Sequence, residues 1–350
     1  MALQSSGQIS YSDIQNEFGS PGNGGFGAYR VSQSVGTLSN LPLDSGIPQS
    51  GQISFSQFYG KRLNCVTNLY SGSTDYRINA RTIYNNSTNN VTCIGNFRTR
   101  PSNPNGKRHF ININKTFGSA KSSNKFVAAV RTGTWGGSSQ VSVDIGGSGR
   151  IFGAGGDGGN GRSGRSDQPG FNGGNGTTAL AIEHNGTTVN HASGALITCG
   201  FAGGGGGGSS REEDSQDRTA GGGGGGGGAG LPAGSGSSGG NSGSNNDEVR
   251  GGAGGGAGST PNTNATREGG AGGEGGWNAG EAVGGDGGRG GDTEGGPQNG
   301  GAGRATGEEW GGGGLHGSNG CAISKASGIS WSFGTQSGTV LGTTNETGVA

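Results

Sequence analysis

The residues that build an ordinary hydrophobic core are scarce in this sequence. Of its 350 residues only 26% are hydrophobic and 6% aromatic, and there is a single methionine. This composition is far from the usual globular mixture. A single hydrophobic core is therefore not expected to hold the whole chain.

Net charge and membrane-spanning segments are also lacking. The chain has 23 basic and 23 acidic residues, so no net field attracts it to nucleic acid or to an anionic membrane. The start of the sequence has no basic and apolar signal regions, and no apolar run is long enough to cross a bilayer. We expect a soluble product made in the cytoplasm, with no membrane insertion.

Motifs for metals, cofactors and catalysis are absent as well. No CxxC pair joins the four cysteines, which are Cys65, Cys93, Cys199 and Cys321. The four histidines show no HExxH spacing, and the GGDGG fragments around Asp157 and Asp286 do not keep the register of calcium-binding repeats. We expect reduced thiols, no metal, no cofactor and no catalytic residue.

A repeat marks the first 64 residues. The segment SGQISYS at residues 6–12 returns as SGQISFS at residues 50–56. Each copy predicts a short helix, with Ser10 or Ser54 as its N-cap. Gly19 and Gly60 follow at positions where glycine ends a helix.

Each of these two helices has one apolar side that is too small to be buried alone. We therefore interpret residues 1–64 as an attachment arm that packs on a partner surface. The candidate attachment residues are Ile9, Tyr11, Ile14, Phe18, Ile53, Phe55, Phe58 and Tyr59.

Residues 65–150 carry short β-type runs separated by Asn, Ser, Gly and Pro. Runs such as 109–113, 126–130 and 141–145, with a turn signal at 103–106, predict a small β-sandwich. This is the one segment with enough apolar residues for a conventional core.

Glycine dominates residues 151–350 and supplies 90 residues of the whole chain. Three states compete: a flexible coil, a collagen helix and a bundle of polyproline-II helices. Collagen requires uninterrupted glycine at every third position, and a linker should be featureless, whereas these glycine blocks alternate with polar insertions. We expect a polyproline-II bundle with a few β-strands, among them a hairpin at Asn185-Gly186 and a C-terminal β-hairpin. The fold class is thus mostly β and irregular.

Several segments resemble a known family. The run DIGGSGRIFGAGGDGG at 144–159, GNGTTAL at 174–180, GALI at 194–197 and the closing GCAI at 320–323 are similar to glycine-rich tail fibre and receptor-binding proteins of tailed bacteriophages. The GQIS repeat resembles N-terminal segments of marine and cyanobacterial phage structural proteins. The resemblance implies a virion protein, a homotrimer by the habit of fibre assemblies, bound through residues 1–64 to other tail, baseplate or fibre proteins. Its partner on the host would be a surface glycan or an outer-membrane protein.

The polar insertions between glycine blocks are the variable surface of such a bundle, so recognition is expected there. Trp277 and Trp310 lie beside acidic residues, and an exposed indole suits a sugar or protein receptor, although each Trp could equally seal the bundle. The candidate receptor-binding residues are Arg211, Glu212, Glu213, Asp214, Asp217, Arg218, Asp247, Arg250, Arg267, Glu268, Trp277, Glu281, Glu308, Glu309 and Trp310.

Two other functions remain open. Some ice-binding proteins are polyproline-II bundles with flat glycine-rich faces, but they would not need charged loops or an arm. A purely structural tail or decoration protein would differ only in having no affinity for host cells.

Overall fold

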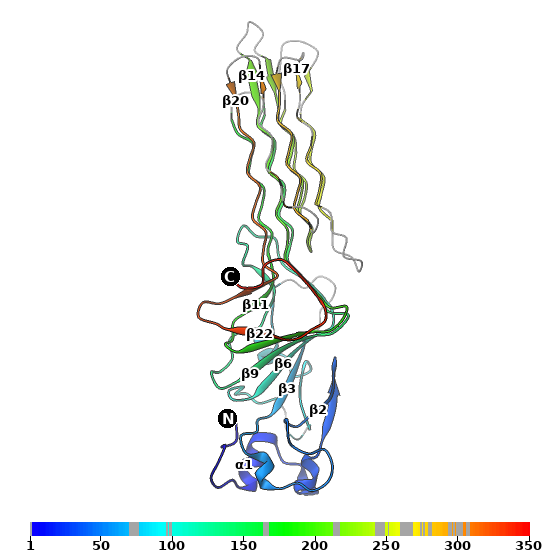
Figure 1. Cartoon of the computed structure of the whole chain (residues 1–350), viewed down its shortest axis with the longest axis vertical. Coiled ribbons are helices and arrows are strands. Elements are labelled where there is room, and N and C mark those ends of the chain that lie inside the picture. Colours follow the sequence, from blue (N-terminus) through cyan, green and yellow to red (C-terminus); the bar gives the residue numbers. More distant parts are fainter. Residues whose placement is uncertain are drawn as a thin grey trace.

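The computed structural model is elongated and has three parts along its length (Figure 1). An N-terminal segment lies at one end, a stack of parallel strands follows, and glycine-rich segments extend to the other end. The structure describes residues 2–69, 77–95, 97, 100–163, 168–212, 218–241, 249–250, 252–259, 269–273, 275, 277–278, 282–292, 296, 298, 304–305 and 309–350.

Both copies of the repeat form a capped helix, as predicted. Helix α1 (Tyr11–Phe18) has a capping box, in which the Ser10 N–H donates to the Asp13 carboxylate at 2.8 Å and the Asp13 N–H donates to Ser10 Oγ at 3.2 Å. Gly19 ends the helix at a φ of 92°, where glycine has no Cβ penalty. The second copy is a 3₁₀ helix, η3 (Phe55–Phe58), with a capping box from Ser54.

The rest of the N-terminal segment contains two 3₁₀ turns and a hairpin: η1 (Gly22–Gly24), η2 (Phe26–Tyr29), β1 (Ser32–Val35) and β2 (Leu38–Pro42). Strands β1 and β2 pair antiparallel. Between them, the Thr37 N–H donates to Asn112 Oδ1 at 3.2 Å, which fixes the hairpin against the first large sheet.

Three sheets built from parallel strands form the middle of the molecule. The first contains β3 (Asn64–Leu69), β5 (Val91–Cys93), β6 (Arg108–Ile113), β9 (Gln140–Ile145), β12 (Thr187–His191) and β22 (Trp331–Gln336). The second contains β7 (Thr116–Gly118), β10 (Arg150–Phe152), β13 (Leu196–Thr198) and β23 (Thr339–Leu341). The third contains β4 (Ile78–Asn79), β8 (Ala128–Arg131), β11 (Thr178–Ile182), β21 (Ile323–Lys325) and β24 (Glu346–Thr347). Helix α2 (Ala80–Asn86) follows β4, and β5 alone in these sheets pairs antiparallel.

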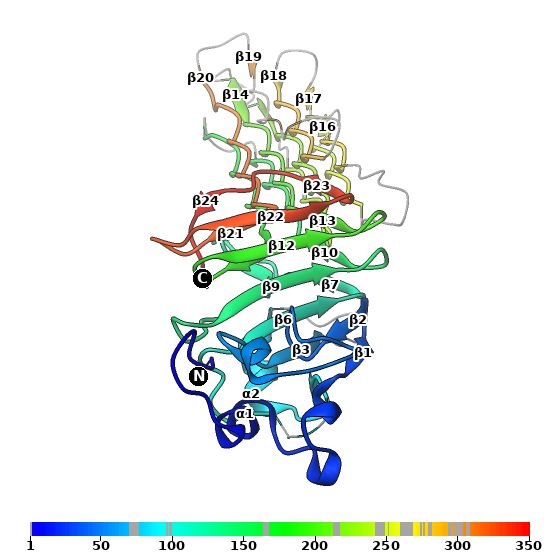
Figure 2. The same ribbon diagram turned by 60° about the horizontal axis from the view of Figure 1, so that its bottom comes forward.

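Successive strands visit the three sheets in turn, which makes a three-sided parallel β-helix. Strands β6, β7 and β8 lie in the first, second and third sheets, and β9, β10 and β11 repeat that order. So do β12, β13 and β21, and then β22, β23 and β24. The sheets continue through the boundary predicted at residue 150, and Figure 2 shows the strands stacked below the glycine-rich part.

This topology confirms a mostly β protein but corrects the predicted sandwich and hairpins. A sandwich pairs antiparallel strands in two sheets, and short alternating runs alone do not distinguish it from parallel stacking. The Asn185-Gly186 turn joins strands of different sheets, so it is a corner of the β-helix, with Gly186 at a φ of 72°. Strands β22 and β23 also lie in different sheets, so they form no C-terminal hairpin.

The β-helix is held together by buried side chains that stack from coil to coil. In each sheet the register places three fully buried residues directly above one another: Ile111, Val143 and Val189; Phe117, Ile151 and Ile197; Val130, Leu180 and Ile323. Burying one such side chain stabilises a fold by about 1.5–3 kcal/mol. These ladders form the main core.

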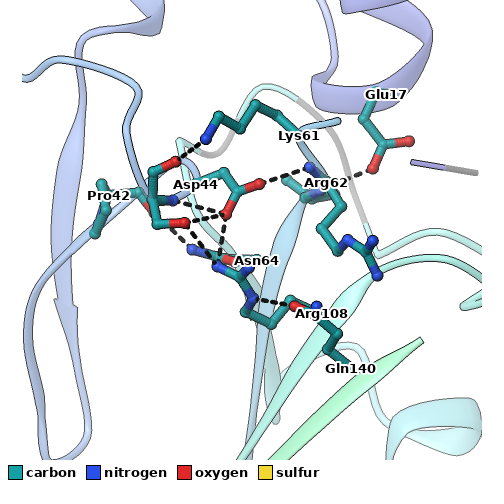
Figure 3. Close-up of polar contacts among 10 residues, drawn as sticks. Glu17, Pro42, Asp44, Lys61, Arg62, Asn64, Arg108 and Gln140 are labelled. Atoms are coloured by element: carbon teal, nitrogen blue, oxygen red, sulfur yellow. Dashed lines mark hydrogen bonds and ion pairs between the residues drawn. The ribbon is translucent and has the colours of Figure 1, made fainter. Parts of the chain in front are cut away.

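The N-terminal segment is fastened to the first coil by buried charges (Figure 3). Asp44 accepts hydrogen bonds from the Arg62 N–H at 2.7 Å and from Arg108 Nη1 at 2.6 Å. Glu17 of α1 forms an ion pair with Lys107 and accepts from the Leu63 N–H at 2.7 Å. Residues 2–63 therefore pack on this chain's own β-helix.

A histidine lies inside the β-helix. The His109 ring stacks on Trp135 with centroids 4.0 Å apart, and its Nε2–H donates to the Pro104 carbonyl at 2.9 Å. Burial lowers the pKa of His109 to about 3. The imidazole is thus neutral in the folded protein.

Acid is expected to destabilise the fold through His109. Because its pKa is lower folded than unfolded, its contribution is complete above about pH 6.5 and is lost as the pH falls toward 3. Between pH 7 and 4.5 this amounts to roughly 2–3 kcal/mol. Denaturant unfolding at both pH values should show a smaller acid loss for His109→Gln than for the exposed control His316→Gln. Equal losses would contradict the assignment.

The glycine array is the set of extended segments beyond the β-helix, residues 153–163, 168–177, 199–209, 220–241, 252–259, 269–273, 284–292 and 311–320 (Figure 1). Its backbone hydrogen bonds run between segments with a period of three. The N–H groups of Gly203 and Gly206 donate to residues 168–177, whereas Gly204 donates to residues 220–230. In a β-strand, the direction of successive backbone groups would instead alternate with a period of two.

Close packing explains why glycine is required in the array. In the central run, a Cβ added to Gly222, Gly224 or Gly226 would lie 2.0, 2.2 or 1.9 Å from the backbone oxygen of residue 207, 237 or 270, respectively. Such contacts are impossible, so these positions require glycine. In the outer segment 311–320 the clash recurs at every third residue, while Gly312 faces open space.

Within the described residues, no helix is long and apolar enough to traverse a bilayer. The same residues contain no cluster of three or more His, Cys, Asp or Glu side chains that could hold a metal ion.

Candidate functional site

Two small antiparallel sheets lie at the end of the glycine array that is farthest from the N-terminal segment (Figures 1 and 2). One contains β14 (Ser210–Glu212), β15 (Arg218–Ala220) and β20 (Glu309–Trp310). The other contains β16 (Val249–Arg250), β17 (Trp277–Asn278), β18 (Ala282–Val283) and β19 (Arg304–Ala305). We call these seven strands the tip.

The tip brings together candidate residues that are far apart in the sequence. In the first sheet Arg211 is opposite Glu309, and Glu212 is opposite Arg218. These pairs place residues of opposite charge at facing positions.

The tryptophan positions also enter the tip. Arg250 is opposite Trp277 in the second sheet, and Trp310 is opposite Ser210 in the first. All receptor-binding candidates that fall on described residues thus belong to tip strands.

Sequence reasoning missed the residues that join the two tip sheets. Ser210 is buried, and its hydroxyl donates to the Val283 carbonyl across the sheets at 3.2 Å. The Val283 side chain is 42% exposed, so it adds an apolar surface to the tip. The sequence signal for Val283 was a β-branched residue, a type that favours strands, within a glycine-rich stretch.

The other candidates lie outside the described residues: Glu213, Asp214, Asp217, Asp247, Arg267, Glu268, Glu281 and Glu308.

The candidate attachment residues divide by burial. Ile9, Ile14, Phe18 and Phe58 are buried in this chain's own core, so their side chains cannot contact a partner in this fold. The remaining four are half-buried or exposed: Tyr11, Ile53, Phe55 and Tyr59.

Phe55 is the most open member of an aromatic group at the N-terminal end. It is 40% exposed, and its ring lies 4.5 Å from that of Phe26, which in turn packs 5.2 Å from Tyr11. Phe58, one of the buried attachment candidates, packs against Phe26 with ring centroids 5.6 Å apart. It is the apolar surface that the N-terminal segment presents.

The array is tied to the β-helix at its base. Lys121 Nζ lies 2.5 Å from the Asp157 carboxylate and 3.1 Å from Ser235 Oγ, so it bridges two glycine segments. Burial alone would raise the pKa of Asp157, but hydrogen bonds from Lys121 and the Ser235 N–H outweigh it and hold that pKa below its usual value. A salt bridge between Lys121 and Asp157 therefore joins the base of the array to the β-helix.

Comparison with protein families identifies the class of molecule. A family described as "Phage tail fibre adhesin Gp38" matches residues 77–253, more than half of the chain. The chain belongs to this family. The match begins just before β4, and it includes the central glycine run and strands β14 to β16 of the tip. Membership places the adhesin in the tail of a bacteriophage virion.

One similar solved structure is titled "Crystal structure of the gp37-gp38 adhesin tip complex of the bacteriophage S16 long tail fiber". It shares 16% sequence identity with the adhesin, over 98% of this chain and 99% of that chain, with a TM-score of 0.36. A similarity this low carries no argument about function. No curated protein matches the sequence.

Proposed function

We propose that the adhesin binds a receptor on the host cell surface, a glycan or an outer-membrane protein, through the tip of its glycine array. The observation that carries this proposal is the convergence of Arg211, Glu309, Trp277 and Trp310 on short strands at one end of the molecule. Charged and aromatic positions beside an exposed valine suit recognition. The function is binding without turnover.

The glycine segments are polyproline-II helices packed side by side in this proposal. The three-residue period of their hydrogen bonds supports it, since polyproline II has three residues per turn and no internal hydrogen bonds. Lateral bonding on several sides stiffens the array. The array then holds the tip away from the virion, and the β-helix acts as a spacer.

Residues 1–64 attach the adhesin to other fibre or tail proteins in this proposal. Its support is the position of the N-terminal segment, which carries the aromatic group of Phe55, Phe26 and Tyr11, at the end opposite to the tip. A homotrimer remains a prediction, which the molar mass from light scattering tests.

Replacing a tip tryptophan should weaken binding to host cells. We expect Trp310→Ala to lower the affinity of the purified adhesin by at least about tenfold, because truncating an aromatic anchor costs about 2 kcal/mol or more. Leu315→Ala is the matched control. Leu315 is 59% exposed, and it lies in the array segment 311–320, which follows β20 and is outside the tip. Cell-binding titrations with the two variants make the measurement.

Exchange of larger parts gives the decisive test. Replacing residues 211–219 and 304–310 with those of a relative should change which cells are bound. Unchanged host range would remove the tip as the receptor site. No binding to any host cell by the intact adhesin would instead favour a purely structural role.

A further inference from the structure

Two of the four cysteines face each other in the first sheet. Cys65 on β3 is directly opposite Cys93 on β5, and their sulfur atoms are 2.7 Å apart. Both side chains are buried, and both are free thiols. Their separation of 28 positions in the sequence gave no sign of this.

The backbone around the pair has the geometry that a disulfide needs. The Ile94 N–H donates to the Asn64 carbonyl at 3.0 Å, and the Asn68 N–H donates to that of Asn90 at 2.9 Å. Hydrogen-bonded pairs alternate with non-hydrogen-bonded pairs along an antiparallel ladder, so Cys65 and Cys93 form a non-hydrogen-bonded pair. Cα atoms in such pairs are about 4.5 Å apart, within the range that disulfides span.

We propose that Cys65 and Cys93 form a disulfide that crosslinks β3 to β5 in the extracellular virion. With dioxygen as the oxidant, two S–H bonds break and one S–S bond forms. The two protons and two electrons pass to dioxygen, which becomes hydrogen peroxide. The pair stays reduced in the cytoplasm, where thiols are kept reduced, and oxidises after release of the virion.

The position of β5 gives the oxidant access. It is a three-residue strand at the edge of the first sheet, so it opens more easily than a central strand. The other cysteines have different surroundings. Cys321, for example, donates from its sulfur to the Glu346 carboxylate at 3.0 Å.

The crosslink strengthens the end of the β-helix that carries the N-terminal segment. It closes the chain segment that contains β4 and α2, and Cys65 is part of the same core as Phe18 and Phe58 of the attachment region. Closing a loop restricts the unfolded chain and so stabilises the fold. The adhesin gains stability when it leaves the cell.

Thiol counting on the intact adhesin tests the proposal. The full-length protein is held in air-saturated buffer at pH 8, denatured in guanidinium chloride with iodoacetamide, and weighed by mass spectrometry. We expect two alkylated cysteines per chain, and a proteolytic peptide pair joined through Cys65 and Cys93. Four alkylated cysteines after this treatment would overturn the proposal.

Variants show whether the pairing is specific and stabilising. Cys199→Ala should keep the crosslink, and Cys93→Ala should lose it. Oxidation should raise the melting temperature of the wild type by roughly 5 °C and leave that of Cys93→Ala unchanged. A crosslink that involves Cys199 or Cys321 would contradict the assignment.

Discussion

Replacing Gly225 with alanine is expected to destabilise the glycine array by about 1–3 kcal/mol or more, the cost of overpacking a close-packed interior. A Cβ on Gly225 would lie 2.2 Å from the Gly204 carbonyl oxygen, and that oxygen belongs to a backbone held on other sides. To relieve this clash, the two glycine segments that contain Gly225 and Gly204 would have to move apart. Such a movement also breaks hydrogen bonds further along both segments.

Gly312→Ala is the matched control, since no atom lies within 4 Å of a Cβ added there. The same substitution reduces the freedom of the unfolded chain equally at both sites, so the difference isolates packing. Gly314→Ala, in the same outer segment, would place its Cβ 2.1 Å from the Phe171 carbonyl oxygen and should resemble Gly225→Ala.

Thermal unfolding and amide hydrogen exchange make the measurement. In the wild type the N–H groups of residues 221–228 should be protected, and Gly225→Ala should speed their exchange while Gly312→Ala should not. Equal exchange in both variants would show that the array is not close-packed in solution.

The sequence carried a clear signal of this packing that was only partly used. Continuous glycine at 221–228 indicates a segment surrounded by neighbours, as the structure has it. Glycines 311, 314, 317 and 320 recur at every third position, which is typical of an outer segment with one packed side. Glycine runs elsewhere in the chain interrupt this period, so the chain as a whole does not match the collagen repeat.

The β-helix could not be predicted from strand patterns. Val130, Leu180 and Ile323 stack directly above one another, although long glycine-rich insertions separate them in the sequence. The insertions 153–177 and 199–320 both lie between the second and third sheets, so the coil length varies and no sequence period survives. Short alternating runs fit parallel and antiparallel pairing equally well.

The N-terminal segment shows a different limit. The apolar sides of its helices correctly predicted that they need a surface to pack on, but the sequence cannot say which molecule provides it. Ile14, Phe18 and Phe58 are buried against this chain's own β-helix. The candidate tip residues were selected for a simpler reason, because longer polar insertions between glycine blocks are expected where the extended segments end.

The buried ion pair between the N-terminal segment and the β-helix makes Glu17 the most sensitive position of that contact. Glu17 and Lys107 are each 3% exposed, and the second Glu17 oxygen accepts from the Leu63 N–H. Glu17→Ala leaves an ammonium group buried without its partner. We expect a loss of about 3–5 kcal/mol in the free energy of unfolding.

Two variants separate charge from packing in this prediction. Ser12→Ala alters an exposed position of the same helix and should change stability by less than about 0.5 kcal/mol. The double variant Glu17→Met with Lys107→Met removes both charges and should recover part of the loss, because apolar residues replace buried ion pairs at little cost while the Leu63 N–H still loses its acceptor. Denaturant unfolding gives the free energies, and limited proteolysis of residues 2–63 reports their release. If Glu17→Ala alone costs less than 1 kcal/mol, the aromatic core rather than the ion pair fastens the N-terminal segment to the β-helix.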